Sequence, residues 1–187
     1  MMHLRAGDLS MVYESGFLRY IKLGEHEVLR MIYFALRDRN WDTMPGQIVD
    51  EKMDVKERSF DISYVWKSTT ADFPFSWNVN IEGTEDERVV FSIDGQAIAD
   101  VLKNRTGFCI LHSVPENMGN PCQITAPDGK VYQNNFPRYI SPHQPFMDIQ
   151  QMKWSLDELG EAVLSFSGDI FEMEDQRNWT DDSYKTY

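Results

Sequence analysis

Residues 60–67, Phe-Asp-Ile-Ser-Tyr-Val-Trp-Lys, decide the fold class of this chain. Large apolar side chains fall at every second position from Phe60 to Trp66, and smaller or polar side chains fall between them. An alternation with a period of two is typical of a β-strand that buries one of its faces. Residues 75–82 repeat the pattern, and we expect them to pair with residues 60–67.

Short strands of the same kind are expected along the whole chain. They are predicted at residues 9–13, 17–23, 28–36, 89–93, 107–112, 147–154, 162–166 and 169–173, and as a hairpin over residues 122–132. Residues 96–102 favour one or two helical turns instead, because their apolar residues are spaced by three and four. The sequence therefore predicts an all-β fold, a two-sheet antiparallel β-sandwich with at most one or two short helical turns. No linker-like stretch divides residues 1–187, which favours a single domain.

The composition supports a folded protein and excludes two classes of partner. A chain of 187 residues with 11 Phe, 8 Tyr and 5 Trp has enough apolar surface to form a core. It lacks an apolar run long enough to cross a membrane, so no membrane partner is expected. Asp and Glu number 30 against 18 Lys and Arg, a net charge of -12, which argues against binding to nucleic acid. The first residues do not resemble a secretory signal, so we expect a cytoplasmic location.

The cysteines and histidines do not form a pattern typical of a metal site. Cys109 lies in the apolar run 108–111, so both Cys109 and Cys122 are expected to be free thiols. The four histidines are dispersed and lack the spacing that zinc ligands show. Glycine-rich phosphate loops are absent from the sequence as well. We therefore predict neither a metal nor a cofactor.

A short sequence that occurs twice is the most informative feature for function. Residues 37–43 and 175–181 both contain Arg-Asn-Trp, and each follows an apolar strand. Arginine can hold a carboxylate or hydroxyl groups while an indole covers the apolar face of a sugar ring, so these segments could bind a sugar or sugar acid. In the alternative interpretation the arginines pair with the neighbouring acids, and the indoles close the edge of the sandwich.

Three further positions could carry acid-base chemistry. His143 lies in the loop 141–146 between two prolines, which would place its imidazole rigidly or simply buttress the loop. Alternation in a strand would put Glu172 and Glu174 on one face, where paired carboxylates could divide acid and base roles. The alternative is that these acids neutralise nearby arginines. His112 ends an apolar strand and is predicted to be a histidine at the edge of the core that hydrogen-bonds a backbone carbonyl, rather than a ligand or a base.

Several stretches resemble the D-apionate lactonase family of sugar-acid catabolism. They are residues 4–45 (LRAGDLSMVYESGFLRYIKLGEHEVLRMIYFALRDRNWDTMP), 102–112 (LKNRTGFCILH), 136–149 (FPRYISPHQPFMDI) and 171–187 (FEMEDQRNWTDDSYKTY). The resemblance spans nearly the whole chain. It implies an N-terminal β-sandwich similar to the galactose-mutarotase supersandwich, followed in full-length members by a TIM barrel and a small β domain. The implied activity is hydrolysis of D-apionolactone to D-apionate.

The sequence departs from that family by stopping at residue 187, before the barrel. A barrel needs about 200 further residues or more, and in barrels of this kind the catalytic acids lie at strand ends. We therefore expect this chain to be non-catalytic on its own and to have the barrel domain and a sugar or sugar-acid lactone as partners. The matched positions expected to contact substrate or the barrel are Arg37, Asp38, Arg39, Asn40, Trp41, Gln144, Glu172, Asp175, Gln176, Arg177, Asn178 and Trp179.

A second hypothesis treats the chain as a stand-alone sandwich that is mutarotase-like or sugar-binding. In that case His143 and Glu174 would be the catalytic acid and base, as a His and a Glu are in the mutarotases that it resembles. Under the first hypothesis the indoles of Trp41 and Trp179 are predicted to be exposed beside arginines, since an apolar patch of this kind marks the surface of a missing partner.

Overall fold

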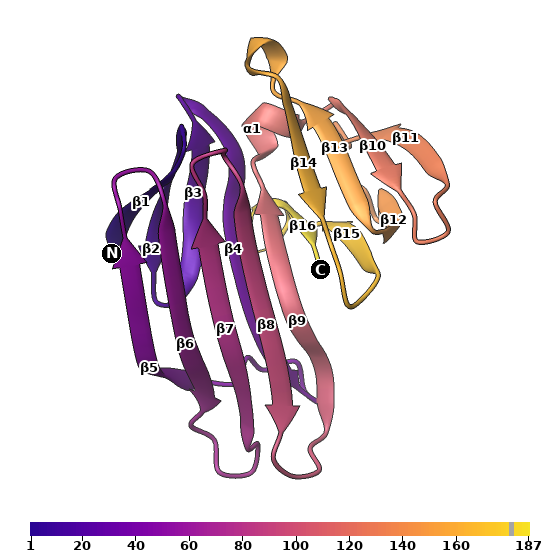
Figure 1. The fold of residues 1–187 in the computed structure, drawn as a ribbon. Coiled ribbons are helices and arrows are strands. Elements are labelled where there is room, and N and C mark those ends of the chain that lie inside the picture. The colour runs from indigo at the N-terminus through magenta and orange to yellow at the C-terminus, as the bar shows by residue number, and fades with distance from the viewer. Residues whose placement is uncertain (180–181) are drawn as a thin grey trace. The chain divides into compact units, whose positions relative to one another are not determined.

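A computed structural model describes residues 1–179 and 182–187 and confirms the all-β prediction (Figure 1). The strands are joined into antiparallel sheets. Within the described residues the helices are short, namely α1 (Val114–Asn117) and the 3-10 turn η1 (Asp157–Leu159). None of these helices is long or apolar enough to cross a membrane.

The chain divides into two compact units, which are described separately. The first unit contains residues 1–24 and 33–108, and the second contains residues 25–32 and 109–187. Two strands, β4 (His26–Asp38) and β9 (Lys103–His112), contribute residues to both units.

The first unit is a sandwich of two sheets. One sheet contains, in order, β1 (Met2–Ala6), β2 (Leu9–Glu14), β3 (Phe17–Leu23) and β4, and the other contains β5 (Gly46–Val55), β6 (Phe60–Ser68), β7 (Phe75–Gly83) and β8 (Val89–Ala97). The decisive stretch forms β6, which pairs with β7 as predicted, with Phe60 opposite Gly83 and Lys67 opposite Ser76.

Aromatic side chains fill the space between these two sheets. Phe34 on β4 packs edge-on against Trp77 at a centroid distance of 4.5 Å, and against Trp66 and Phe91 at 6.1 and 6.4 Å. Edge-to-face packing of this kind adds about 1 kcal/mol per pair beyond the area buried. The alternating apolar positions of β6 and β7 therefore face the first sheet, as the period-two pattern predicts.

The second unit also has two sheets. One contains the end of β9 followed by β16 (Tyr184–Thr186), β15 (Phe171–Asp175) and β12 (Phe146–Ile149), and the other contains β11 (Val131–Asn135), β10 (Pro121–Thr125), β13 (Gln151–Ser155) and β14 (Glu161–Ser165). Phe136 lies in the core, with its ring centroid 5.4 Å from that of Phe146 and 5.3 Å from that of Tyr184.

Two local predictions are wrong. Residues 96–102 form no helix, because β8 continues to Ala97, which pairs with Phe75 on β7. Residues 147–154 do not form one strand. β12 ends at Ile149, directly after Asp148, which has a positive φ of 52°. The chain then enters β13 in the other sheet of the second unit. The strands β1, β5 and β16 were not predicted.

Both cysteines are free and buried, as predicted. Cys122 has no exposed surface, and burial raises the pKa of its thiol to about 12. The thiolate is the reactive form of cysteine, so Cys122 is chemically inert at neutral pH.

Candidate functional site

The second Arg-Asn-Trp segment begins where β15 ends and is built on a buried ion pair. Arg177 holds Asp175 with two parallel hydrogen bonds, from Nε to Oδ1 at 2.8 Å and from Nη2 to Oδ2 at 2.6 Å. The Asp175 side chain has no exposed surface, and the Arg177 side chain is 11% exposed. Bidentate geometry and burial make this a strong pair.

The remaining donors of the Arg177 guanidinium are also occupied. Nη2 donates to the carbonyl of Pro137 and Nη1 to the carbonyl of Arg138, both at 3.1 Å. Nη1 also approaches the Met118 sulfur at 3.8 Å. A guanidinium has five N–H donors, and these contacts use all five. Arg177 therefore holds the chain together and has no donor left for a ligand.

The electrostatics of the pair follow from these contacts. Burial raises the pKa of the Asp175 carboxyl, but the hydrogen bonds from Arg177 and from the Ser141 amide outweigh burial and bring that pKa below its usual value. The hydrogen bond to Asp175 raises the pKa of Arg177 in turn. Both groups are therefore charged at neutral pH. The Arg177 guanidinium also lies 4.9 Å from the centroid of the Tyr184 ring.

The loop that contains His143 is attached to the same network. The Ser141 amide donates to Asp175 Oδ2 at 3.0 Å, and the Ser141 hydroxyl donates to the carbonyl of His143 at 2.7 Å. The side chains of His143 and Gln144 are exposed. The loop is thus pinned through its backbone, and the imidazole faces solvent.

The carboxylates of Glu172 and Glu174 share one hydroxyl group, that of Tyr187. The Tyr187 oxygen lies 2.8 Å from Glu172 Oε1 and within hydrogen-bonding distance of Glu174 Oε1. Gln176 Nε2 donates to Glu174 Oε2 at 2.5 Å. The two glutamates therefore lie on one face of β15, as predicted.

The first Arg-Asn-Trp segment forms a self-contained turn after β4. Asp38 Oδ1 accepts hydrogen bonds from the amides of Asn40 and Asp42 at 2.8 and 3.0 Å. Arg37 Nη1 donates to the Trp41 carbonyl at 3.1 Å and to the Thr43 hydroxyl at 2.9 Å. The Arg37 guanidinium is thus partly used to close its own turn.

The two segments share one backbone hydrogen bond. The Trp41 amide donates to the Asp38 carbonyl at 3.1 Å, and the Trp179 amide donates to the Gln176 carbonyl, its equivalent, at 2.9 Å. Both indoles are exposed, Trp41 by 52% and Trp179 by 70%. Residues 180–181, at the end of the second segment, lie outside the described residues.

The arginines of the two turns differ. When residues 37–43 are aligned with residues 175–181, Arg39 corresponds to Arg177. Arg39 and Asn40 are exposed. Trp41 instead has the Arg105 guanidinium 5.6 Å from its ring centroid. The first turn lies in the first unit and the second turn in the second unit.

His112 is fully buried, and burial lowers the pKa of its imidazole to about 3. Its Nε2 lies 2.8 Å from the Thr186 hydroxyl, which donates to the Met152 sulfur. Nδ1 has no hydrogen-bond partner among the described residues. His112 lies in the core, as predicted, but the prediction of a backbone carbonyl partner is wrong, because Nε2 contacts the Thr186 hydroxyl.

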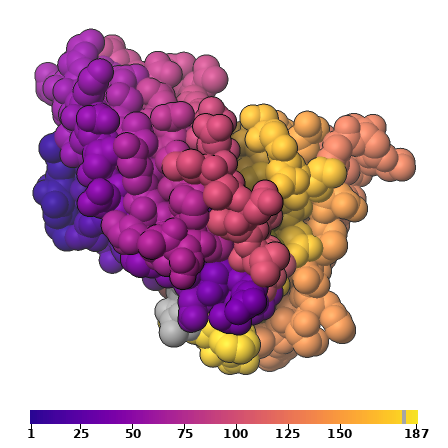
Figure 2. Space-filling model, turned by 90° about the horizontal axis from the view of Figure 1, so that it is seen from below, coloured from indigo at the N-terminus to yellow at the C-terminus, as the bar shows by residue number. Residues whose placement is uncertain are grey.

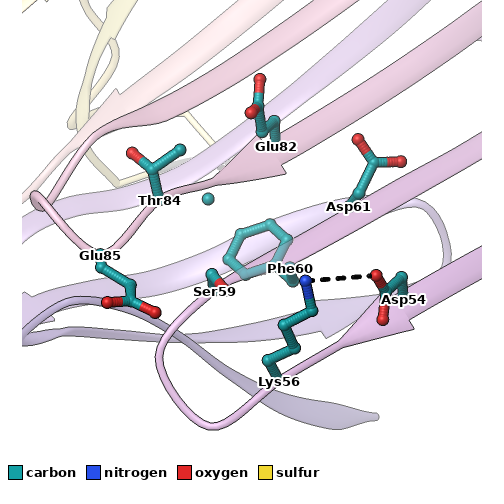
Figure 3. Close-up of a pocket in the computed structure, with 9 residues that line it drawn as sticks. Asp54, Lys56, Ser59, Phe60, Asp61, Glu82, Thr84 and Glu85 are labelled. Carbon is teal, nitrogen blue, oxygen red and sulfur yellow. Dashed lines mark ion pairs between the residues drawn. The ribbon is translucent and has the colours of Figure 1, made fainter.

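Two open pockets lie in the first unit, and neither contains a predicted site residue. One, of about 300 Å³, is lined by the carboxylates of Asp54, Asp61, Glu82 and Glu85, and Lys56 pairs with Asp54 at 3.6 Å (Figure 3). No group of three or more His, Cys, Asp or Glu within residues 1–179 and 182–187 could hold a metal ion.

The second pocket, of about 390 Å³, contains a tyrosine-carboxylate contact. The Tyr13 hydroxyl donates to Glu51 Oε1 at 2.5 Å, and burial together with this hydrogen bond raises the pKa of Tyr13. The alternating pattern did not predict this pocket, because β5, which contributes Glu51, has few apolar residues.

Sequence reasoning also missed the partners of Arg177. Met118, Pro137 and Arg138 contact its guanidinium from segments 39 to 59 residues away in the chain. The opposite charges of Asp175 and Arg177, two residues apart in the sequence, could predict the ion pair. They could not predict that the pair binds the loop of residues 137–141.

The comparisons with known proteins agree on a family. Residues 1–187 match the family described as D-apionate lactonase, N-terminal domain. The chain is also 35% identical over 186 residues to the D-apionate lactonase of Brucella anthropi, a match that covers 99% of this chain and 30% of that protein. The resemblance inferred from the sequence is confirmed: the chain belongs to the D-apionate lactonase N-terminal domain family.

Proposed function

We propose that this chain is the non-catalytic N-terminal domain of an enzyme that hydrolyses D-apionolactone to D-apionate. The match of all 187 residues to the N-terminal domain family carries the proposal. The 30% share of the relative's length supports a larger enzyme whose remainder carries the chemistry. In the reaction, water adds to the lactone carbonyl and the ring C–O bond breaks, which gives a carboxylic acid and a hydroxyl group.

The contacts of the predicted site residues support a structural role for this domain. Hydrolysis of an ester needs a base beside the attacking water and donors aimed at the developing oxyanion. Here the donors of Arg177 are used by Asp175 and backbone carbonyls, and Glu174 is engaged by Gln176 and Tyr187. These residues stabilise a loop and a strand end.

The activity of two polypeptides tests the proposal. The complete polypeptide that contains this chain and the purified 187-residue chain are each incubated with D-apionolactone, and acid release is followed at constant pH. We expect hydrolysis by the complete polypeptide and no rate above buffer for the 187-residue chain. Equal rates per mole would place the catalytic groups inside this chain, and a complete polypeptide inactive towards D-apionolactone would contradict the substrate.

A second candidate function is that of a sugar-binding or mutarotase-like sandwich. The exposed rings of Trp179 and Tyr139 favour it, because aromatic rings cover the apolar faces of sugars. Calorimetry with D-apionolactone, D-apionate and common aldoses tests binding, with Trp179→Ala as the matched variant. Acceleration of aldose mutarotation that disappears in both His143→Ala and Glu174→Gln would support the mutarotase form.

A further inference from the structure

We infer that an exposed apolar surface on the second unit packs against the rest of the full-length enzyme. This surface, called here the docking surface, consists of Met118, Tyr139, Ile140 and Trp179. The inference rests on the proposed function, because it requires a larger polypeptide, and it names the part of this domain that the larger polypeptide covers.

The four side chains of the docking surface are unusually exposed for their type. Tyr139 is 89% exposed, Trp179 70%, Ile140 47% and Met118 44%. Tyrosine, tryptophan and methionine are enriched in protein interfaces, and a group of exposed apolar side chains marks a surface that has a partner.

The contacts of Arg177 bring these residues together. Arg177 reaches the sulfur of Met118 and the carbonyl of Arg138, which directly precedes Tyr139. Trp179 follows Arg177 by two residues, in the turn that its own amide closes. Figure 2 shows the corresponding orange surface, near residue 140, beside the yellow surface that follows residue 175.

The docking surface is held rigidly although its side chains face solvent. The segment 137–141 has no strand or helix, yet Arg177 binds it at Pro137 and Arg138, and Asp175 binds it at Ser141. The Tyr184 hydroxyl also donates to the Pro137 carbonyl at 2.7 Å. A loop fixed in advance loses little conformational entropy on binding, so this network lowers the cost of forming an interface.

The remainder of the same polypeptide is the occupant that these observations favour. The family is described as an N-terminal domain, and the chain covers 30% of the relative's length, so the larger part of the relative lies outside the matched region. β16 runs from Tyr184 to Thr186, and Tyr184 contacts Arg177. Three residues separate Tyr184 from residue 187, which is about 10 Å at about 3.3 Å per residue of strand. A polypeptide that continues beyond residue 187 would therefore start about that far from the contact between Tyr184 and Arg177. Tethering at this distance gives a high effective concentration, so a small surface suffices.

Hydrogen-deuterium exchange tests the inference without any substitution. The amides of residues 138–141 and 177–179 are compared in the 187-residue chain and in the complete polypeptide. We expect exchange at least about tenfold slower in the complete polypeptide, since tenfold corresponds to 1.4 kcal/mol of added protection. Equal exchange in the two samples overturns the inference, and so does a complete polypeptide that is no longer than this chain.

A charge variant and a matched control sharpen the test. Tyr139→Asp should leave the unfolding midpoint of the 187-residue chain unchanged, because its side chain is almost fully exposed. In the complete polypeptide it should return the exchange of residues 138–141 to that of the isolated chain and speed proteolysis after residue 187. Ile98→Asp, a 71% exposed position in the first unit, should change neither. An unchanged Tyr139→Asp polypeptide contradicts the inference.

The lactonase assay separates this inference from the proposed function. Slow exchange at residues 138–141 in a complete polypeptide that does not hydrolyse D-apionolactone refutes the activity and supports the surface. Hydrolysis without any change in exchange refutes the surface and supports the activity. Concentration-dependent protection in the 187-residue chain alone, lost in Tyr139→Asp, would assign the surface to a second copy and overturn the inference.

Discussion

Arg177 and Arg39 occupy the same position of the two Arg-Asn-Trp segments, but their surroundings give them different roles. Arg39 is exposed, whereas Arg177 pairs with a carboxylate that has no exposed surface. A charge that is buried and paired is costly to leave unpaired. The stability of the second unit therefore depends on Arg177, while Arg39 remains available to solvent or to a ligand.

Arg177→Leu is expected to destabilise the chain by about 3 to 5 kcal/mol, because it leaves the Asp175 carboxylate buried without its partner. Equilibrium urea unfolding measures the free energy of unfolding. Arg39→Leu is the matched control and should change it by less than about 0.5 kcal/mol. Equal losses in the two variants would show that the Asp175 pair contributes nothing special.

The same pair gives the chain an acid sensitivity of known sign. The pKa of Asp175 is lowered in the folded state, so its contribution is present above the pKa of an unfolded aspartate, near 3.9, and is lost as the pH falls through the folded value. Between pH 5 and pH 3 the free energy of unfolding should therefore fall more for the wild type than for Asp175→Asn, as urea unfolding at the two pH values would measure. A parallel loss in both would contradict this.

His112 predicts a second acid sensitivity in a separate pH range. The folded pKa of about 3 lies below the unfolded value of about 6.5, so only the unfolded chain takes up this proton between these values. Stability should fall as the pH drops from 6.5, by up to about 1.4 kcal/mol per pH unit. His112→Leu should remove this slope, and the exposed control His143→Leu should retain it. Urea unfolding between pH 7 and pH 4.5 measures both slopes.

At the residue scale the sequence could predict which side chains are unusual but not what they contact. The exposure of Trp41 and Trp179 and the position of His112 in the core follow from local patterns, and all three are confirmed. The carbonyls bound by Arg177 come from distant segments, which no local pattern specifies.

At the scale of elements, glycines allow the aromatic rings of β6 and β7 to lie against neighbouring strands. A Cβ atom added at Gly95 on β8 would lie 2.4 Å from Nε1 of Trp77, which is directly opposite. At Gly83 the added atom would lie 2.2 Å from the Phe60 ring, in the pair that closes the other end of the sheet. These glycines are required by the close approach of the rings.

Gly95→Ala is therefore expected to destabilise the chain by about 1 to 3 kcal/mol, the usual cost of overpacking. Trp77 is buried, so its ring cannot move away freely. Thermal unfolding followed by circular dichroism measures the effect, and Gln96→Ala, the exposed neighbouring position, is the control. A stability equal to that of the control would mean that the Trp77 ring adapts.

The predicted strands were most reliable where one face is buried. β6 and β7 bury alternate residues and were predicted with their pairing. β5 is exposed along most of its length, so it lacks a period-two pattern. The helical turns expected near residue 97 were wrong because pairing with β7 outweighs a weak local spacing. A period-two sequence pattern arises from the burial of one strand face, so a strand that is exposed on both faces does not show it.

At the scale of the whole molecule, the single-domain expectation for residues 1–187 stays a prediction that unfolding can test. β4 and β9 supply residues to both compact units, so neither unit can unfold without disturbing strands of the other. We expect one cooperative transition that tryptophan fluorescence and circular dichroism report at the same midpoint.

Core variants of the two units test this cooperativity. Ile62→Ala in the first unit and Met173→Ala in the second each truncate a side chain with no exposed surface, and each should cost about 2 to 5 kcal/mol. Both should lower the midpoint of the same transition. Two transitions, each shifted by only one of the variants, would show that the units are independent domains.

The burial of both thiols gives the chain a practical property. Because Cys109 and Cys122 are buried, and Cys122 stays protonated at neutral pH, a maleimide dye should find no natural target on the folded surface. A single cysteine introduced as Tyr139→Cys would then be labelled selectively. An environment-sensitive fluorophore at that position would report directly, by the colour of its emission, whether water or protein covers this part of the molecule.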